Sequence, residues 1–375
     1  MNDTEKNAYQ ASLFKNRLEK QYRLRKKWAR KNMLTCYRLY DRDIPEVPLS
    51  MDLYTLLPKN ITSKEASIHY FSEANSRISE NGPAAARIKK ELLERTFLHM
   101  YLYERPYHKE PEAEAEWLSA MAEKAAETIG VEQSHVICKT RRRFSGGERG
   151  RKGQYERAES AEPVAGRVLE NGEVFFVNLS DYIDTGLFFD HRPLRNIVRA
   201  TCGARSVLNL FCYTGSFSVY AAEGNASHVH SIDASNTYLA WAQKNMWLNG
   251  FTDPTRFSFE KEDVLAWLER PNGTEKYDII ILDPPTFSNS KRSRDTLDLN
   301  RDWPRLVERC LRILSPHGTL YFSTNSRRLR FEEQALPASS QGAPLWRGTD
   351  ITRQTIPEDY RNTSVHRVWR IERST

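Results

Sequence analysis

Runs that resemble strands and helices alternate regularly from about Asp181 onward, and this pattern limits the fold more than any other feature. Two parallel strands need a long crossover between them, which is usually a helix, so the alternation predicts a doubly wound, mostly parallel sheet. The predicted strands are Ser206–Phe211, His228–Ile232, Phe257–Glu260, Tyr277–Leu282 and Thr319–Ser323, with closing strands at Asp350–Pro357 and Val365–Ile371. Four helices are predicted: one that follows the Cys212–Ser216 loop and runs through Ala222, one at Asn236–Leu248 after the cap Ser235, a short one that ends at Leu268, and one at Trp303–Leu314.

The first 180 residues have a mixed pattern instead. Pro111–Ile129 is an amphipathic segment that stops at Gly130, and it predicts a helix. Asn171-Gly172 is a type I′ turn signal and predicts a hairpin. Strands are predicted at Cys36–Tyr40, Leu49–Leu56, Arg95–Tyr103, His135–Thr140, Gly166–Leu169 and Glu173–Leu179. We therefore expect three parts: a basic linker helix at 1–33, a small α+β RNA-binding domain at 34–180, and an α/β domain at 181–375.

Residues 57–93 interrupt the strand pattern of the small domain. They are polar, and Asn81-Gly82-Pro83 is a strong breaker, so we expect an irregular insertion there.

Positive charge is in excess and is clustered. The chain has 56 Lys and Arg against 49 Asp and Glu, a net charge of +7. The excess indicates an acidic partner, with nucleic acid ahead of membrane, although plain solubility is the alternative. The helix Glu5–Lys31 is basic in its second half, which suits either RNA contact or a solvated linker. The predicted RNA contacts are Arg25, Lys26, Lys27, Arg141, Arg142, Arg143, Arg151, Lys152, Lys291, Arg292, Arg327 and Arg328.

The five cysteines are scattered, and no CxxC or Cys/His cluster occurs in the sequence. We therefore expect no structural metal and no disulfide framework, and reduced thiols suit the cytoplasm. No signal-peptide core is present, and no apolar run reaches the ~18 residues of a membrane span.

Three polar positions follow successive predicted strands of the α/β domain. Thr214-Gly215-Ser216 is a turn that allows close approach of the backbone to a ligand, Asp233 suits a ribose diol, and Asp263 suits an adenine amino group. A dehydrogenase is similar up to Asp233, but it needs a G-x-G-x-x-G loop, and between Leu210 and Ala222 only Gly215 occurs. S-Adenosylmethionine carries no phosphate and needs no such loop. The pattern therefore favours S-adenosylmethionine as the cofactor.

The fourth strand runs into Asp283-Pro284-Pro285-Thr286-Phe287. This segment resembles the Asp/Asn-Pro-Pro-aromatic motif of methyltransferases that act on amino and ring nitrogens. Two prolines stiffen the turn and leave carbonyls without competing N–H groups, and an aromatic ring can stack on a flat base. The predicted catalytic residues are Asp283, Pro284, Pro285 and Phe287. The alternative is a strand-ending turn with a core phenylalanine.

Longer segments carry a more specific resemblance. They are Asn32–Pro45, Asn178–Arg192, Leu208–Ser216 and Asp283–Lys291. Together they are similar to the guanine-N7 methyltransferase half of the bacterial bifunctional 23S ribosomal RNA methyltransferase, the RlmK part of the RlmKL family. The resemblance implies a Rossmann-like, seven-stranded class I methyltransferase domain behind a small α+β domain and an N-terminal basic helix.

The same resemblance implies that Asp184–Arg192 covers the methionine end of the cofactor. The complete predicted cofactor set is Phe188, Asp190, Arg192, Asn209, Phe211, Tyr213, Thr214, Gly215, Ser216, Asp233, Ala234, Asp263, Val264 and Asp283. The implied partner is 23S ribosomal RNA or a large-subunit precursor. Members of the family are usually fused to an RNA-binding module and a guanine-N2 methyltransferase, so a separate module of that kind is a further expected partner.

The atom that is methylated follows in part from chemistry. Cytosine-C5 transfer needs a Cys nucleophile, and the segment Tyr321–Asn325 contains none. Guanine N7 has a lone pair and no proton, so a flipped base held in line suffices, which agrees with the absence of an evident His/Glu dyad in the sequence. Guanine-N2 and adenine-N6 transfer also suit Asp-Pro-Pro, and the family resemblance favours N7. A non-catalytic RNA-binding factor for ribosome assembly is the alternative from another class.

Overall fold

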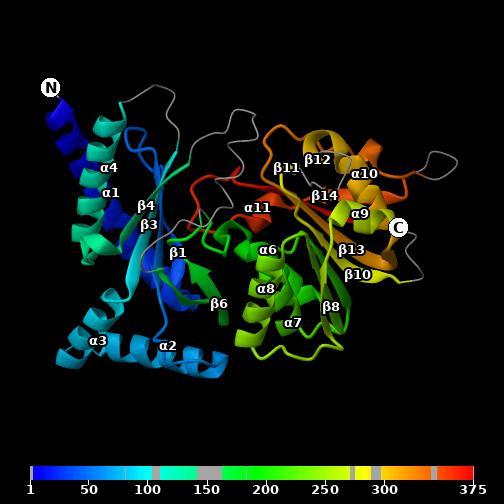
Figure 1. Ribbon diagram of the computed structural model, residues 1–375, viewed down its shortest axis with the longest axis horizontal. Coiled ribbons are helices and arrows are strands. Elements are labelled where there is room, and N and C mark those ends of the chain that lie inside the picture. Colours follow the sequence, from blue (N-terminus) through cyan, green and yellow to red (C-terminus); the bar gives the residue numbers. More distant parts are fainter. Residues whose placement is uncertain are drawn as a thin grey trace. The chain divides into compact units, whose positions relative to one another are not determined.

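The computed structural model describes residues 3–80, 82–103, 110–141, 163–182, 184–270, 275–288, 297–338 and 344–374 (Figure 1). The chain forms two compact units. Unit 1 comprises Met1–Leu187 together with Glu358–Arg361, and unit 2 comprises Phe188–Pro357 together with Asn362–Thr375. In the described part of the chain, no helix combines the length and the apolar character that a membrane crossing needs.

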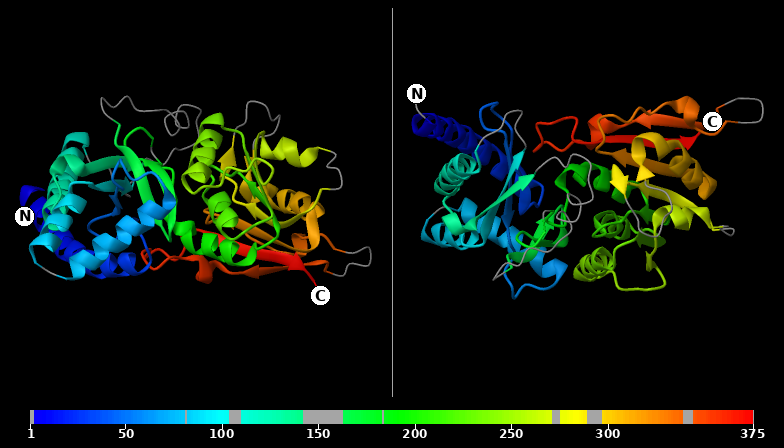
Figure 2. Two further views of the ribbon diagram at one scale, coloured as in Figure 1. Left: turned by 90° about the horizontal axis from the view of Figure 1, so that it is seen from below. Right: turned by 45° about the horizontal axis from the view of Figure 1, so that its top comes forward.

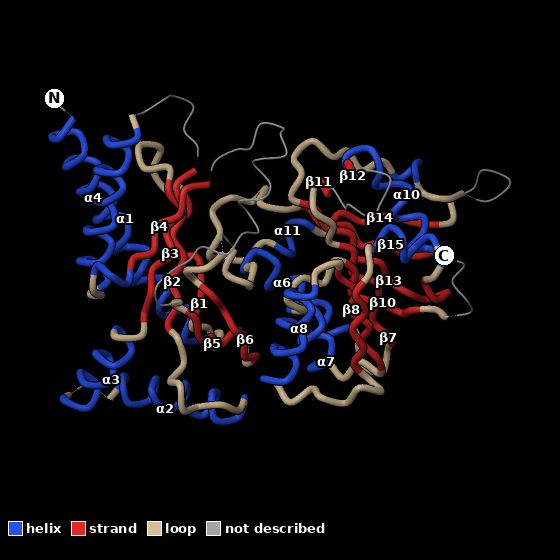
Figure 3. Tube along the Cα trace, in the orientation of Figure 1, coloured by secondary structure: helices blue, strands red, loops and turns tan. Residues whose placement is uncertain are grey.

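Unit 1 is built around a four-stranded sheet in the order β1-β2-β3-β4. Strand β4 is parallel to β3, and the other neighbours are antiparallel. Helices α1 and α4 lie side by side against this sheet, where Phe14, Leu18 and Trp117 are buried (Figures 1 and 3). These elements are α1 (Asp3–Lys31), β1 (Cys36–Asp41), β2 (Leu49–Thr55), β3 (Thr96–Tyr103), α4 (Pro111–Ile129) and β4 (Val136–Arg141), which confirms the elements predicted there.

Two local signals in unit 1 had the structural effect predicted from them. Gly130 ends α4 with a φ of 85°, a left-handed conformation that suits glycine. Asn171 and Gly172, with φ values of 53° and 91°, join the antiparallel strands β5 (Ala165–Glu170) and β6 (Glu173–Asn178).

The prediction of an irregular insertion at 57–93 is wrong. The segment contains helices α2 (Lys64–Ser79) and α3 (Pro83–Leu93). The Ser63 hydroxyl accepts a hydrogen bond from the Ala66 N–H at 3.1 Å and caps α2. Pro83 begins α3 rather than breaking it, because the first turn of a helix does not use the N–H that proline lacks.

Unit 2 contains the predicted seven-stranded sheet, in the order β14-β15-β13-β10-β7-β8-β9. Five neighbouring strands are parallel, and β15 and β14 close the edge beyond β13 as an antiparallel pair. The strands are β7 (Ser206–Leu210), β8 (His228–Asp233), β9 (Phe257–Lys261), β10 (Tyr277–Leu282), β13 (Leu314–Thr324), β14 (Trp346–Asp350) and β15 (Arg367–Arg373).

Helices cover both faces of this sheet (Figures 1 and 2). One face carries α6 (Arg192–Thr201), α7 (Ser216–Glu223) and α8 (Asn236–Leu248), and the other carries α9 (Val264–Glu269) and α10 (Leu299–Arg312). Between the sheet and α9–α10, Leu282, Trp303 and Phe322 belong to a continuous buried core. The expected strand Asp350–Pro357 is wrong, because β14 ends at Asp350 and Thr352–Thr355 form the helical turn α11.

Candidate functional site

The loop after β7 has an unusual backbone. Phe211, Tyr213 and Gly215 have φ values of 56°, 51° and 72°, in the left-handed region that residues with a Cβ rarely adopt. The Cys212 N–H donates to the Ile232 carbonyl of β8 at 3.0 Å, and the Gly215 N–H donates to the Cys212 carbonyl at 2.8 Å. Such conformations persist where the surroundings hold them, and they gather at binding sites.

Gly215 has a packing reason that the sequence did not reveal. A Cβ at this position would lie 2.7 Å from the Cβ of Ala242 on α8. Glycine therefore lets α8 pack against the start of α7, and this accounts for the residue independently of any ligand. Ser216 is the first residue of α7.

Asp233, the last residue of β8, holds this loop in place. Its Oδ2 accepts from the Tyr213 N–H at 3.0 Å, and its Oδ1 accepts from the Ser235 N–H at 2.9 Å. Burial raises the pKa of Asp233, and backbone N–H groups at Ser235, Tyr213 and Ala234 lower it in part. Each carboxylate oxygen has a second lone pair, so Asp233 can still accept hydroxyl hydrogen bonds from a ribose.

Aromatic rings form a row next to this loop. Phe188, which is 43% exposed, lies 5.4 Å from Tyr213 between ring centroids, and Tyr213 lies 4.5 Å from Tyr238. Phe188 and Tyr213 belong to the predicted cofactor set, whereas Tyr238, in the first turn of α8, does not. An exposed ring beside the Asp233 loop offers an apolar surface on which a flat purine can pack.

Other members of the predicted set have roles inside the protein. Asp263 caps α9, since its Oδ1 accepts from the N–H groups of Leu265 and Ala266 at 3.0 and 3.2 Å. The Asn209 side chain is buried and donates from Nδ2 to the Ser218 hydroxyl at 2.9 Å. Thr214 and Val264 are buried as well, and Arg192 is buried with its guanidinium 5.3 Å from the Phe189 ring centroid.

The loop after β10 is attached to the end of β13 at two points. The Ser323 hydroxyl donates to Asp283 Oδ1, and the Thr286 hydroxyl donates to Asn325 Oδ1 at 2.6 Å. Pro284 between them is buried. Phe287 begins the short strand β11 (Phe287–Ser288), whose backbone pairs with β12 (Leu297–Asp298). The Phe287 side chain lies outside the described part, so its stacking role stays a prediction.

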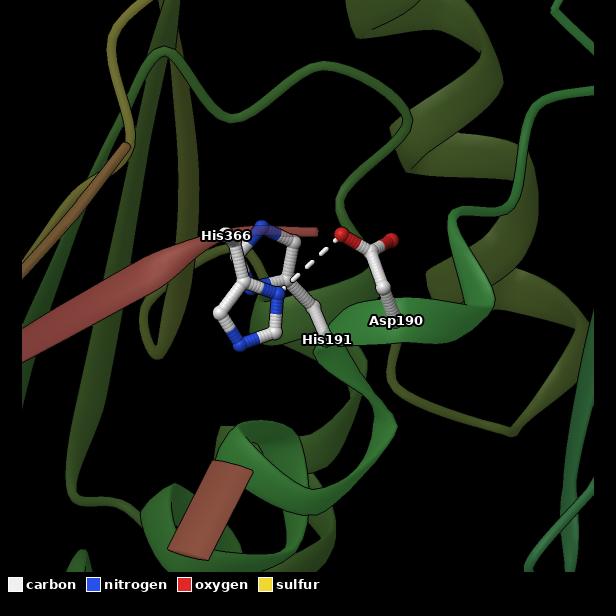
Figure 4. A group of neighbouring side chains, drawn as sticks. All are labelled: Asp190, His191 and His366. Atoms are coloured by element: carbon white, nitrogen blue, oxygen red, sulfur yellow. Dashed lines mark hydrogen bonds and ion pairs between the residues drawn. The ribbon is translucent and has the colours of Figure 1, made fainter. Parts of the chain in front are cut away.

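The sequence contains no evident His/Glu dyad, but the structure brings a histidine and an aspartate together in the site. His191 Nε2 lies 3.5 Å from Asp283 Oδ2. On the other side, His191 stacks on His366 with ring centroids 4.6 Å apart and ring planes within 6° (Figure 4). His366 Nδ1 lies 3.1 Å from Asp190 Oδ2, and His366 Nε2 lies 2.9 Å from the Thr355 hydroxyl. His191 adjoins the predicted Asp190, but no signal connects His366 with a segment so distant in sequence.

Charge and burial oppose one another in this cluster. Burial lowers the pKa of His191, and the carboxylates of Asp283 and Asp190 offset only part of that effect. Burial alone would raise the pKa of Asp190, but the neighbouring His191 and the hydrogen-bonded His366 reverse this and hold it well below its usual range. His191 is therefore neutral, and Asp190 ionised, near neutral pH.

Asp190, His191 and His366 each offer a ligand atom, and these atoms lie within 4.8 Å of one another. Metal binding nevertheless suits the geometry poorly. The two imidazole planes are parallel, so their nitrogen lone pairs lie in parallel planes and do not converge on one ion. Both ring nitrogens of His366 already have partners.

The predicted RNA contacts lie in both units. Lys26 and Lys27 are exposed on α1, and Arg25 is partly exposed there. The pKa of Lys26 is lowered by burial and by Arg30, Lys89 and Arg23, so helix α3, which carries Lys89, adds to a cluster of positive charge. Arg327 and Arg328 are exposed after β13. Arg142, Arg143, Arg151, Lys152, Lys291, Arg292 and the Arg141 side chain lie outside the described residues.

Known proteins are similar to this chain over most of its length. Ribosomal RNA large subunit methyltransferase K/L from Pseudomonas putida (strain W619) is 37% identical over 364 residues, which are 96% of this chain and 42% of that protein. The protein of the same name from Stutzerimonas stutzeri (strain A1501) is 37% identical over 362 residues, with the same coverage. The chain thus spans less than half the length of these relatives.

A solved structure is similar over nearly the whole chain. It is a candidate methyltransferase in complex with SAH, with a TM-score of 0.63 and 19% identity, and the match covers 97% of this chain and 82% of that one. A candidate SAM-dependent methyltransferase from Streptococcus mutans has the same TM-score and identity, with 97% and 81% covered. At this identity the match shows the fold alone.

A family model described as S-adenosylmethionine-dependent methyltransferase matches residues 96–340. That span includes the loop after β7, Asp233, and the Asp-Pro-Pro segment, the features that favoured this cofactor from sequence. With more than half of its length matched, the chain belongs to the S-adenosylmethionine-dependent methyltransferase family.

Proposed function

We propose that this chain transfers a methyl group from S-adenosylmethionine to N7 of a guanine in large-subunit ribosomal RNA. The observation that supports it best is the position of Asp283. Strand β7 lies between β10 and β8 in the sheet. The loops that follow the carboxyl ends of these three strands are therefore neighbours, with the Asp283 loop on one side of the Phe211–Gly215 loop and Asp233 on the other. Ligands of such sheets bind at this edge, where the strand order reverses.

The residues at this edge have different tasks in the proposal. Asp233 accepts the ribose hydroxyls, and Phe188 and Tyr213 contact the adenine. Bound S-adenosylmethionine supplies an electrophilic methyl group. Asp283, Pro284 and Pro285 hold the target base. The prolines have no backbone N–H, so their carbonyl groups face the base without a competing donor from the same residue. Guanine N7 has a lone pair and loses no proton, so holding the base in line and excluding water are enough.

Ribosomal RNA as the substrate rests on two supports. The similar proteins from Pseudomonas putida and Stutzerimonas stutzeri are named ribosomal RNA large subunit methyltransferases. The charge of +7, together with the clustered cations of α1, suits a polyanion. We propose that Arg25, Lys26 and Lys27 contact the RNA backbone.

The experiment is methyl transfer from radiolabelled S-adenosylmethionine to an unmodified 23S ribosomal RNA transcript, followed by mapping of the product. Borohydride reduction and aniline treatment cleave RNA at N7-methylguanosine and leave N2-methylguanosine intact. Cleavage at a labelled guanine supports the proposal. If the labelled RNA resists cleavage and yields N2-methylguanosine, the methylated atom is the exocyclic N2 and the proposal of N7 is wrong.

One observation favours that second candidate. Transfer to guanine N2 must release a proton, and His191 is a neutral, buried imidazole beside Asp283. A neutral imidazole can accept a proton, whereas N7 transfer leaves no proton to remove.

A further inference from the structure

His191 is held in an unusual way. Its side chain is buried, and among the described residues its Nδ1 has no hydrogen-bond partner. Its Nε2 lies 3.5 Å from Asp283 Oδ2. Leaving a buried polar atom unpaired costs free energy, and such exceptions in a folded protein call for an explanation.

The contacts indicate which nitrogen carries the proton. Near neutral pH the ring is neutral, so one nitrogen is a donor and the other an acceptor. A proton on Nε2 faces the Asp283 carboxylate, whereas a proton on Nδ1 would have no described acceptor. The Nε2–H tautomer is therefore favoured, and it presents a donor to Asp283.

The stacked ring of His366 limits the freedom of His191. His366 is fixed at both nitrogens, by Asp190 at 3.1 Å and by the Thr355 hydroxyl at 2.9 Å. The Phe217 ring contacts His191 edge-on, with centroids 5.7 Å apart. Because its neighbours are held, the His191 ring is held too, and its Nε2–H keeps one direction.

We propose that His191 is a positioning residue for Asp283, and that its neutral Nε2–H fixes the carboxylate orientation that methyl transfer requires. This inference rests on the proposed function. Asp283 is then contacted from two sides, with Ser323 donating to Oδ1 and His191 Nε2 lying 3.5 Å from Oδ2. His366 supports this arrangement indirectly, by stacking on the His191 ring.

The arrangement makes methyl transfer sensitive to acid. The charged or titratable groups that face His191 are Asp283 after β10, Asp190 in the turn before α6, His366 before β15, and Arg195 on α6. When His191 gains a proton, the imidazolium attracts the Asp283 carboxylate more strongly and draws it toward the histidine. The carboxylate is then misplaced for the base, so transfer falls as the pH drops through the pKa of His191.

The test compares His191→Gln and His191→Ala with the unchanged protein, using single-turnover methyl transfer to the 23S transcript from pH 5.0 to 8.5. The Gln side-chain amide retains a donor near the position of Nε2 and does not titrate. We expect Gln to keep neutral-pH transfer within about threefold and to lose the acid decline, and Ala to lose transfer roughly 100-fold at every pH. Affinity for S-adenosylhomocysteine, measured by calorimetry, should stay within about threefold in both.

The control is His230→Gln. The His230 side chain is 12% exposed against 10% for His191, and its Nε2 lies 3.3 Å from Glu260. His230 lies next to Tyr277, at the start of β10, and not at the Asp283 loop that follows the strand. The His230→Gln variant should keep the acid decline. Three results would overturn the inference: an unchanged acid decline in His191→Gln, a Gln variant as impaired as Ala, or full activity in Ala. Loss of folding in the Ala variant, visible in its thermal unfolding, leaves the Gln pH profile as the deciding result.

Failure of the proposed function gives a different pattern. If the unchanged protein methylates no RNA, nitrogen-15 NMR of selectively labelled histidine still tests the positioning. We expect the His191 signals, assigned by their loss in His191→Gln, to show the Nε2–H tautomer and to shift in Asp283→Asn. Signals that do not respond to Asp283→Asn would contradict the contact itself.

Discussion

Of the three histidine–carboxylate pairs among the described residues of unit 2, the His191–Asp283 and His230–Glu260 pairs are nearly matched in burial. The side chains of His191 and Asp283 are 10% and 32% exposed, and those of His230 and Glu260 are 12% and 32% exposed. Burial lowers the pKa of both histidines, and the paired carboxylates raise it in part. The pairs differ in what surrounds them, so burial and charge alone do not distinguish their roles.

The His230 pair is saturated with hydrogen bonds. His230 Nδ1 lies 2.9 Å from the Tyr277 hydroxyl, and Glu260 accepts from Trp267 Nε1 at 3.0 Å and from Arg270 Nη1 at 2.7 Å. The His191 pair has a longer contact and an unpartnered nitrogen among the described residues. We therefore expect the saturated His230 pair to stabilise the fold, and the under-bonded His191 pair, at the carboxyl ends of the parallel strands, to take part in the proposed reaction.

The largest expected effect comes from removing the carboxylate of the under-bonded pair. Asp283→Ala should lower methyl transfer to RNA by at least about 100-fold, because the target base loses the group that positions it. Circular dichroism should show a retained fold. Glu260→Gln should leave the transfer rate within about threefold and lower the free energy of unfolding by about 1 kcal/mol or less, since it weakens charged hydrogen bonds that are partly exposed to solvent. Full activity in Asp283→Ala would refute the site assignment.

Asp233 tests whether saturation always marks a structural carboxylate. Both of its oxygens accept hydrogen bonds, as those of Glu260 do, although the donors here are backbone N–H groups, and Asp233 ends β8 next to the Phe211–Gly215 loop. Asp233→Ala should weaken S-adenosylhomocysteine binding about 10- to 100-fold, the effect of losing hydrogen bonds from a charged group of about 1.5–3 kcal/mol. Calorimetry measures it, with Asp253→Ala, an exposed acid that caps a turn, as the control. If Asp233→Ala binds S-adenosylhomocysteine as tightly as the unchanged protein, Asp233 has a structural role only.

Unit 1 offers a change that should affect neither histidine. Replacing Arg25, Lys26 and Lys27 together with Glu should weaken RNA binding about tenfold at low salt and make its salt dependence shallower, because fewer counterions are released. Filter binding at several salt concentrations measures this, and the acid decline of methyl transfer should stay unchanged. An unchanged RNA affinity would exclude this face of α1 from the contact.

The smallest expected effect concerns stability in acid, and it should be equal for both pairs. A histidine whose pKa is lowered by folding binds its proton more readily in the unfolded chain. Stability is therefore full above about pH 6.5 and declines as the pH falls toward the lowered value. His191→Gln and His230→Gln should each reduce this decline by on the order of 1 kcal/mol in denaturant unfolding at pH 7.5 and 5.5. Only His191→Gln should also alter the pH profile of transfer.

The features that depend on local sequence were predictable. Asp233 and Asp283 follow apolar runs, and strand ends of a parallel sheet converge, so their proximity could be inferred. The Asn171-Gly172 turn and the Ser235 cap are local signals as well.

The features that the sequence did not predict depend on contacts between residues distant in the sequence, or on a proline that can either end or begin a helix. His366 reaches the site only through the pairing of β15 with β13, which no short motif encodes. Pro83 can stop or start a helix, and the polar residues around it concealed α2 and α3. The close packing of Gly215 on Ala242 likewise requires the position of α8 to be known.

The four residues Glu358–Arg361 have a consequence for the order in which the chain matures. The Arg38 N–H donates to Asp359 Oδ2 at 2.9 Å across 321 positions, and the Arg361 N–H donates to Asp41 Oδ2 at 3.2 Å. On a ribosome that adds about 5–20 residues per second, unit 1 stays incomplete for tens of seconds after its first 187 residues emerge. The hydrogen bonds of Asp359 and Arg361 to β1 can therefore form only after nearly all of unit 2 has been made.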